Sequence, residues 1–181
     1  MASSPALEPV YLPNREVSPK LDLELRALFL EAFPHEAEDL KTRRYFRECP
    51  AHRWIIFGPH GQPIAHVAAH DKTFASSQGP IRAIGVAEVC VTASFRGRGF
   101  VRRILQDVHA WARSRDYPFS LLFGNIAVYR RSGYLPTTNV YRYWKYQTRE
   151  WIEEPISGAL ALPLGDQPWP EGPIDLAGPL F

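Results

Sequence analysis

The segment VCVTASFRGRGFVRRIL, residues 89–105, decides the fold of this 181-residue chain. It begins with apolar residues typical of a strand and continues with a turn rich in arginine and glycine. Its last residues have the pattern of the first turn of an amphipathic helix. This order leaves unpaired backbone N–H groups at a helix N-terminus, where the partial positive charge favours a phosphate or pyrophosphate. Glycine lets the backbone approach such an anion, and arginine adds charge-assisted hydrogen bonds. We therefore expect a phosphorylated ligand at this turn.

Length and composition limit the class of protein. A chain of 181 residues predicts one domain over residues 1–181, and 21 basic against 19 acidic residues argue against a nucleic-acid binder. Cys49 and Cys90 show neither a metal-type spacing nor a disulfide framework, which favours a reducing compartment and predicts no metal. The sequence shows no signal-peptide pattern and no apolar stretch of about 18 residues. These features predict a cytoplasmic protein that does not bind membranes.

Apolar periodicity outlines the elements around the turn. We predict helices over 21–33, 36–47, from about 101 to 111, and 126–132. We predict strands over 10–12, 54–57, 63–71, 81–92 with an interruption at Gly85, 119–123, and within 134–147. The tail from about 157 to 181 is rich in proline and glycine and should be extended. The order predicts an α/β (α+β) domain with a mixed central sheet, antiparallel N-terminal strands and flanking helices.

Two motifs carry a resemblance to a known family. The turn Arg96-Gly97-Arg98-Gly99-Phe100-Val101 follows the acyl-CoA loop pattern Arg/Gln-x-x-Gly-x-Gly/Ala, with Val101 in place of a small residue. Residues 125–134, from Asn125 through Tyr129 and Gly133 to Tyr134, follow the pattern Asn…Ala-x-Tyr-x-x-x-Gly-Tyr/Phe. With both motifs in this order, residues 21–147 resemble the GCN5-related N-acetyltransferase (GNAT) superfamily. The resemblance implies a single GNAT-like domain that uses acetyl-CoA as co-substrate.

The resemblance also implies which residues meet the coenzyme and what covers the acceptor. The expected coenzyme contacts are Val89, Cys90, Val91, Arg96, Gly97, Arg98, Gly99, Phe100, Val101, Arg102 and Asn125. The tail with Trp169-Pro170 is similar to the tails of nodulation N-acyltransferases and aminoglycoside 2′-N-acetyltransferases, which implies that residues 157–181 cover the acceptor side. Many relatives dimerise, so a homodimer is compatible with the resemblance.

Acetyl transfer to an amine needs a base, a polarised thioester and a stabilised leaving thiolate. The resemblance puts the Tyr129 hydroxyl near the coenzyme sulfur, where a phenol with a pKa near 10 can act as the acid. Glu88 is the candidate base, directly or through water, because its apolar strand should desolvate the carboxyl and raise its pKa. His66 and His70, on one face of the neighbouring strand, are alternatives.

The acceptor is the least specified part of the prediction. Glu36, Asp39 and Asp175 are the candidate substrate-binding residues for a cationic acceptor. We predict acetyl transfer from acetyl-CoA to a primary amine of a small molecule, such as an amino sugar or aminoglycoside-like compound, by direct attack in a ternary complex. One alternative is a longer-chain N-acyltransferase that takes its donor from acyl carrier protein or acyl-CoA. Another is a non-catalytic acyl-CoA-binding module.

Overall fold

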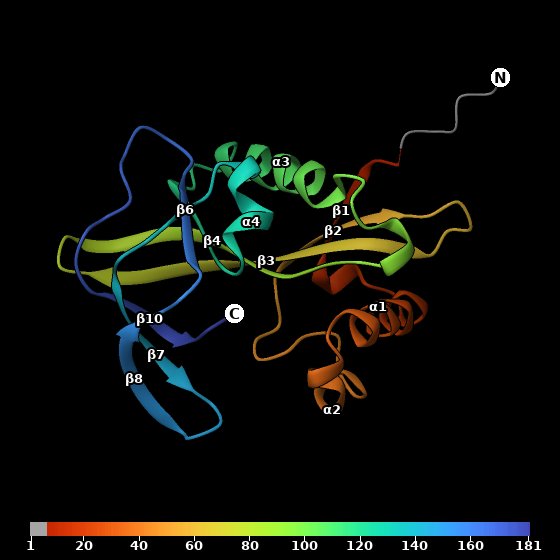
Figure 1. Ribbon diagram of the computed structural model, residues 1–181, viewed down its shortest axis with the longest axis horizontal. Helices are drawn as coiled ribbons and strands as arrows, with labels where there is room; N and C mark the ends of the chain where they lie inside the picture. The colour runs from red at the N-terminus through yellow and green to blue at the C-terminus, as the bar shows by residue number, and fades with distance from the viewer. Residues whose placement is uncertain (1–6) are drawn as a thin grey trace.

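The computed structural model describes residues 7–181, whose strands join into one mixed sheet flanked by helices (Figure 1). The strands are β1 Pro9–Pro13, β2 His52–Phe57, β3 Pro63–Ser76, β4 Gly79–Val91, β5 Phe119–Phe123, β6 Leu135–Pro136, β7 Val140–Lys145, β8 Glu150–Pro155, β9 Ala159–Pro163 and β10 Ile174–Pro179. The α-helices are α1 Pro19–Ala32, α2 Ala37–Leu40, α3 Phe100–Arg113 and α4 Ile126–Tyr129. Short 3₁₀ turns are η1 Asn14–Glu16, η2 Pro34–Glu36, η3 Ala93–Phe95 and η4 Arg130–Ser132. The predicted α/β class with a mixed sheet is confirmed.

The long strand β3 organises the sheet. It pairs antiparallel with β4 along most of its length, with β2 near its start and with β10 at its end. The strand order is β6-β9-β5-β4-β3-β10-β7-β8, and β1 and β2 extend the sheet beside the first half of β3. Among the described strands only β4–β5 and β10–β7 run parallel. The antiparallel N-terminal strands are therefore as predicted.

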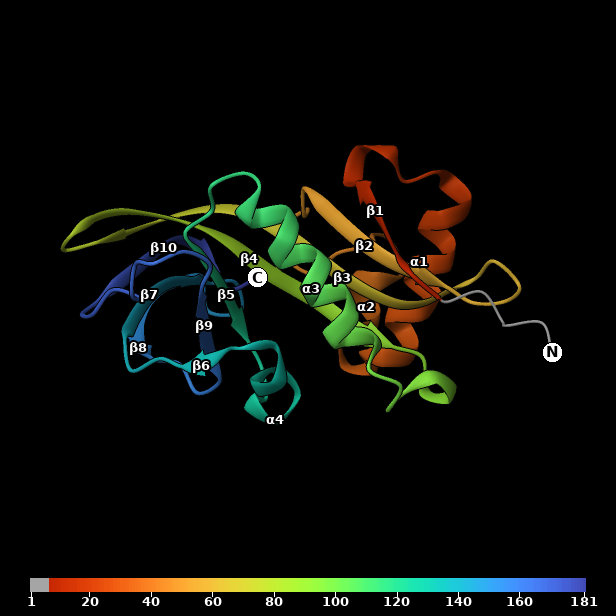
Figure 2. The same ribbon diagram turned by 90° about the horizontal axis from the view of Figure 1, so that it is seen from above.

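Two helix layers cover opposite faces of the sheet, with α3 on one side and α1 and α2 on the other (Figures 1 and 2). On α3, Ile104, Leu105 and Val108 are buried against the sheet, at the helical spacing that the sequence indicated. On α1, Leu25 and Phe29 pack on the other face. Within residues 7–181, no helix combines the length and apolar character needed to cross a membrane.

The predicted second helix over 36–47 is wrong beyond its first turn, because α2 ends at Leu40. Beyond α2, backbone carbonyl groups of the segment accept hydrogen bonds from arginine side chains. The carbonyl of Arg44 accepts a hydrogen bond from the buried Arg53 guanidinium, and the carbonyl of Tyr45 accepts one from Arg43. The segment therefore runs as an irregular loop along the sheet, and local periodicity carries no signal of these partners.

The predicted interruption at Gly85 is also wrong, since β4 passes through Gly85 in regular register. Glycine is required there for space, because a Cβ atom would lie 2.7 Å from the ring of Phe181. The irregularity in β4 lies at Glu88 instead, where the pairing with β3 shifts. The sequence thus indicated an irregular strand but at the wrong residue.

The C-terminal third contributes more strands than the sequence predicted. β8 was not predicted, and the tail supplies β9 beside β5 and β10 between β3 and β7. Between these two strands, the Trp169 ring packs edge-on against Phe119 and its Nε1 donates to Asn139 at 2.8 Å. The tail is therefore part of the sheet and core, and it delivers Phe181 back to the centre of β4.

Candidate active site

The parallel strands β4 and β5 separate in the middle of the molecule. Their pairing ends at Val86 and Leu122, while β4 continues to Val91. The N–H of Thr92 donates to β3 at 2.9 Å, so strand alternation turns the backbone groups of Val91 and Val89 toward the open edge. An unpaired strand edge is thus exposed to a ligand between β4 and β5.

A β-bulge at Glu88 begins this open edge. Glu88 and Val89 together oppose Val67 of β3, and Glu88 has a φ of 50°. This left-handed conformation costs a non-glycine residue about 1–3 kcal/mol, so the surroundings must enforce it. One such restraint is the His66 ring, whose Nδ1 lies 2.9 Å from the Glu88 carbonyl oxygen.

A fully buried arginine links the bulge to the N-terminal layer. Arg53 donates to the Glu88 carboxylate at 3.0 Å and to His66 Nε2 at 3.0 Å. Its Nε donates to Asn14 at 2.7 Å. Since guanidinium has no acceptor, His66 Nε2 must accept, and Nδ1 then carries the proton given to the Glu88 carbonyl. Burial and the Arg53 charge hold the pKa of His66 well below its usual value, so this ring is neutral.

Glu88 is the titratable group best placed to act near neutral pH. Burial raises the pKa of its carboxyl to about 7, although Arg53 and the Phe46 backbone amide act in the opposite direction. His70 also faces the pocket, but burial followed by the charge of Lys72 lowers its pKa to about 3. A general base works best when its pKa is near the working pH, so near neutral pH Glu88 suits the role of base better than either histidine.

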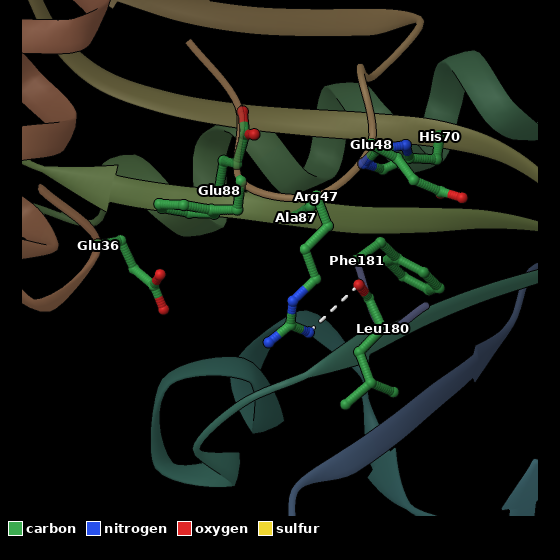
Figure 3. A pocket seen from close by; sticks show the side chains of 9 residues that line it. Glu36, Arg47, Glu48, His70, Ala87, Glu88, Leu180 and Phe181 are labelled. Carbon is green, nitrogen blue, oxygen red and sulfur yellow. Dashed lines mark hydrogen bonds between the residues drawn. The ribbon is translucent and has the colours of Figure 1, made fainter. Parts of the chain in front are cut away.

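Glu88 is one of the residues lining a pocket of about 150 Å³ between β4, the 41–50 loop and the C-terminal residues (Figure 3). A second hollow of about 360 Å³ shares Glu36, Phe46 and Arg47 with it and extends outward. The inner pocket is lined by Glu36, Phe46, Arg47, Glu48, His70, Ala87, Glu88, Leu180 and Phe181. Its volume is below the roughly 300–1,000 Å³ of typical ligand pockets, which suits one small end of an acceptor.

Tyr129 lies at the end of α4, where β5 turns away from β4. Its ring packs on Gly124, where an added Cβ atom would lie 2.7 Å from the ring. Burial, with a smaller effect of Cys90, raises the pKa of Tyr129 to about 12. Its hydroxyl therefore stays protonated, and a thiol with a pKa of about 8.5 would bind that proton less tightly than the phenolate does. The raised pKa favours Tyr129 as a hydrogen-bond donor to a thiolate over full proton transfer.

The arginine–glycine turn leads into an open helix N-terminus, as predicted. Gly97 and Gly99 have φ angles of 75° and 78°, which glycine adopts without strain. Gly99 supplies no side-chain cap to α3, so the N–H groups of the first turn stay available. The Val101 side chain packs against the core of the domain, so the departure from a small residue does not fill the turn.

Not all side chains of the turn are equally available. Arg96 donates to the Val91 carbonyl at 3.2 Å, and Arg98 donates to Ser94 while its guanidinium lies over Phe95. Arg102 is exposed on the first turn of α3. These positions line the approach to the open edge of β4.

The remaining predicted residues are spread over the molecule. Asn125 caps α4, with its side chain accepting from Ala127 N–H at 2.9 Å. Glu36 lines the inner pocket, whereas Asp39 lines the outer hollow and pairs with Arg43 at 2.7 Å. Asp175 lies on β10 in a separate hollow and pairs with Arg142 at 2.6 Å. The structure thus brings Glu36 and Glu88 together, and it does not bring Asp175 to them.

Sequence reasoning missed several residues of the pocket, chiefly Arg47, Phe46 and Phe181. All three lie outside regular elements, so no periodicity marks them. Arg53 was also missed, although a charged residue directly before the apolar run 54–57 was a usable signal of a buried partner.

A split parallel pair, a strand bulge and an open helix N-terminus are the features that the predicted acyl-CoA-dependent acyltransferase class requires. Residues 15–137 match the family model described as an acetyltransferase (GNAT) domain. The chain therefore belongs to the GNAT acetyltransferase family, an acyl-CoA-dependent class, as its two motifs predicted. A comparison with curated proteins found no match.

Solved structures share this fold. A GNAT family N-acetyltransferase from Escherichia coli, in complex with CoA, is 18% identical with a TM-score of 0.67, covering 97% of this chain and 93% of that one. A GNAT family acetyltransferase from Brucella melitensis, in complex with acetyl-CoA, is 17% identical with a TM-score of 0.60, covering 93% and 95%. An aminoglycoside acetyltransferase from an uncultured soil metagenomic sample is 17% identical with a TM-score of 0.55, covering 70% and 90%. Against several larger structures, this chain spans only about a third of their length.

Proposed function

We propose that this protein transfers the acetyl group of acetyl-CoA to a primary amine of a small molecule by direct attack in a ternary complex. The observation that carries the proposal is the bulge at Glu88. On one side Glu88 lines the inner pocket, and on the other the next residue, Val89, turns its backbone toward the open edge. An amine and a thioester held on these two sides meet at the same strand.

The amine side needs a group that removes a proton near neutral pH. Glu88 has a pKa of about 7, and it lines a pocket small enough for an amine-bearing end. Glu88 takes the proton directly or through one water molecule, and the neutral amine then attacks the thioester carbonyl. His66 acts through the bulge as a positioning residue, because both of its nitrogens already have partners.

The thioester side needs a donor for the carbonyl oxygen and a partner for the leaving sulfur. The free backbone N–H of Val89 suits the developing oxyanion, and the Tyr129 hydroxyl suits the thiolate. The described residues offer the Tyr129 hydroxyl no hydrogen bond of their own, so it remains available for a ligand. Collapse of the intermediate breaks the C–S bond and leaves an N-acetyl product. The second proton of the amine nitrogen passes to the CoA thiolate, directly or through water, so that CoA leaves as the thiol, and Glu88 returns the first proton to solvent.

The coenzyme fits the turn that precedes α3. The pyrophosphate would accept hydrogen bonds from the N–H groups of Gly97, Gly99 and the first turn of α3, with Arg98 and Arg102 adding positive charge. The pantetheine arm would run along Val89, Cys90 and Val91 in place of the missing β5 pairing. Asn125 would support the same groove from the start of α4.

Thiol release from acetyl-CoA in the presence of a panel of primary amines tests the proposal. The panel includes amino sugars and an aminoglycoside, which the sequence resemblance favours. The Tyr129→Phe and Glu88→Gln variants serve as matched chemical controls, because each keeps the shape of the side chain. If wild-type protein binds acetyl-CoA but no amine raises thiol release above the hydrolysis rate, the proposed reaction is refuted.

The donor is tested separately, because the alternative prediction was a longer acyl chain carried by acyl carrier protein or CoA. Thermal shift and turnover with acetyl-CoA, a long-chain acyl-CoA and acylated carrier protein distinguish the donors. If the enzyme prefers a long-chain donor, the transferred group is a long acyl chain instead of acetyl, and the reaction is still acyl transfer to an amine.

A further inference from the structure

Two charged residues of the acceptor pocket have no ion-pair partner within residues 7–181. They are Glu36 and Arg47. The other charged side chains at this site are paired, Glu88 with Arg53 and Glu48 with Lys72. The site therefore offers one unmatched positive and one unmatched negative group.

Arg47 occupies the wall that the inner pocket and the outer hollow share. Figure 3 shows its side chain extending between Glu36 and Leu180, with one hydrogen bond at 3.4 Å to the Leu180 carbonyl. A guanidinium presents five donors in a planar fork, so most of its hydrogen-bonding capacity is unused here. A half-buried fork of this kind fits a carboxylate or phosphate oxygen pair.

We infer that the acceptor of the amine reaction also carries an anionic group, and that Arg47 binds this group. The inference rests on the proposed function, because it assigns the substrate class of the same pocket. The amine lies toward Glu88, and Glu36 matches the positive charge that the amine carries before it is deprotonated. Phe46 and Phe181 provide apolar walls for the body of the acceptor.

An aminoglycoside carries several positive charges and no anion, so this pocket suits it less well than an amino carboxylic acid or an amino sugar phosphate. The two anions share the chemistry that Arg47 recognises, and the experiment separates them. The first test pair is phenylalanine and phenethylamine, which differ only in the carboxylate. The second test pair is glucosamine 6-phosphate and glucosamine, which differ only in the phosphate.

The test measures kcat/KM for both pairs with wild type, Arg47→Gln and Arg15→Gln. Arg15 is a matched control, because its side chain is 82% exposed and lies outside the pocket. We expect wild type to prefer one anionic member by about 10- to 100-fold, the range of a hydrogen-bonded charge pair. We expect Arg47→Gln to remove this preference and to retain turnover of the neutral member, which also shows that the variant folds. Arg15→Gln should behave like wild type.

The possible results separate the inference from the proposed function. Amine-dependent turnover without preference for either anion, or a preference that survives in Arg47→Gln, overturns the inference and leaves the proposed function standing. A preference for phenylalanine identifies a carboxylate, and a preference for glucosamine 6-phosphate identifies a phosphate. Absence of turnover with every amine refutes the proposed function, and the inference fails with it.

Discussion

Replacing Glu88 by glutamine tests the base in a way that the structure makes quantitative. Glutamine keeps the shape of the side chain, and its oxygen still accepts a hydrogen bond from Arg53. With a pKa of about 7, the carboxylate fraction rises from roughly a tenth at one pH unit below to roughly nine tenths at one unit above. General base catalysis contributes about 10²-fold or more. Wild type should therefore exceed Glu88→Gln by about 10²-fold at pH 8 and by about tenfold at pH 6.

The assay is thiol release at saturating acetyl-CoA and low acceptor, from pH 5.5 to 8.5. The ionisation of the acceptor amine affects both proteins equally, so the ratio of their kcat/KM values isolates the carboxyl group. Glu48→Gln is the matched control, because Glu48 lines the same pocket but pairs with Lys72. We expect it to change the rate by less than about fivefold and without pH dependence. A flat ratio between wild type and Glu88→Gln over this range would refute the assignment.

Three further predictions concern the groove, the turn and the pocket wall. Tyr129→Phe should lower kcat by about 10- to 100-fold and leave the KM for acetyl-CoA nearly unchanged, as steady-state kinetics would show; an unchanged kcat contradicts the role. Gly99→Ala should weaken CoA binding about fivefold by calorimetry, because alanine lets the free turn relax from a φ of 78° and restoring that conformation in the complex costs about 1 kcal/mol. Gly165→Ala should not, because Gly165 is not in the left-handed region. Gly85→Ala should displace the Phe181 ring and lower the free energy of unfolding by about 1–3 kcal/mol in urea titrations; wild-type stability would exclude this packing.

The same carboxyl predicts a dependence of stability on pH. The pKa of Glu88 is raised on folding from 4.5 to about 7, so the folded state binds the proton more tightly. Its contribution to the free energy of unfolding therefore falls as pH rises from about 4.5 to 7. Wild type should lose stability relative to Glu88→Gln over this interval, measured as the difference between their urea midpoints at pH 5 and pH 8. A constant difference would mean that the carboxyl keeps its ordinary pKa in the fold.

Local signals predicted the parts of the fold that local interactions determine. α1 follows Ser18, whose hydroxyl caps Leu21 N–H at 3.2 Å, and α3 follows two glycines at positive φ. Both helices carry apolar residues at the helical period, and both were predicted. The glycine-rich turn before α3 was predicted for the same reason, because its sequence signal lies within six consecutive residues.

Contacts distant in sequence decided the parts that were missed. The helix predicted over 36–47 ends at Leu40, and the backbone beyond it contacts side chains distant in sequence, such as Arg53, which donates to the Arg44 carbonyl. The ion-pair partner of Glu88 is 35 residues away. The position of Arg53 before an apolar run signals that it is buried, but nothing in either strand shows that its partner is Glu88. Glu88 was still identified, because a carboxyl within an apolar strand is unusual by itself. Arg47 and Phe181 become pocket residues only because the 41–50 loop and the C-terminal tail come together beside β4 in the folded protein.

The position of β10 has a consequence for the way the chain reaches its native state. Among the strands of residues 7–181, β10 alone pairs the hairpin of β7 and β8 with the rest of the sheet, and it follows β8 by about 20 residues. During synthesis, the edges of β3 and β7 stay unpaired until Ile174–Pro179 has left the ribosome. Such late, non-local pairing slows folding, and the incomplete sheet exposes edges that favour aggregation. Assembly of the wall that carries Phe181 is therefore coupled to completion of the sheet, so a nascent chain that lacks residues 174–181 has no finished acceptor pocket.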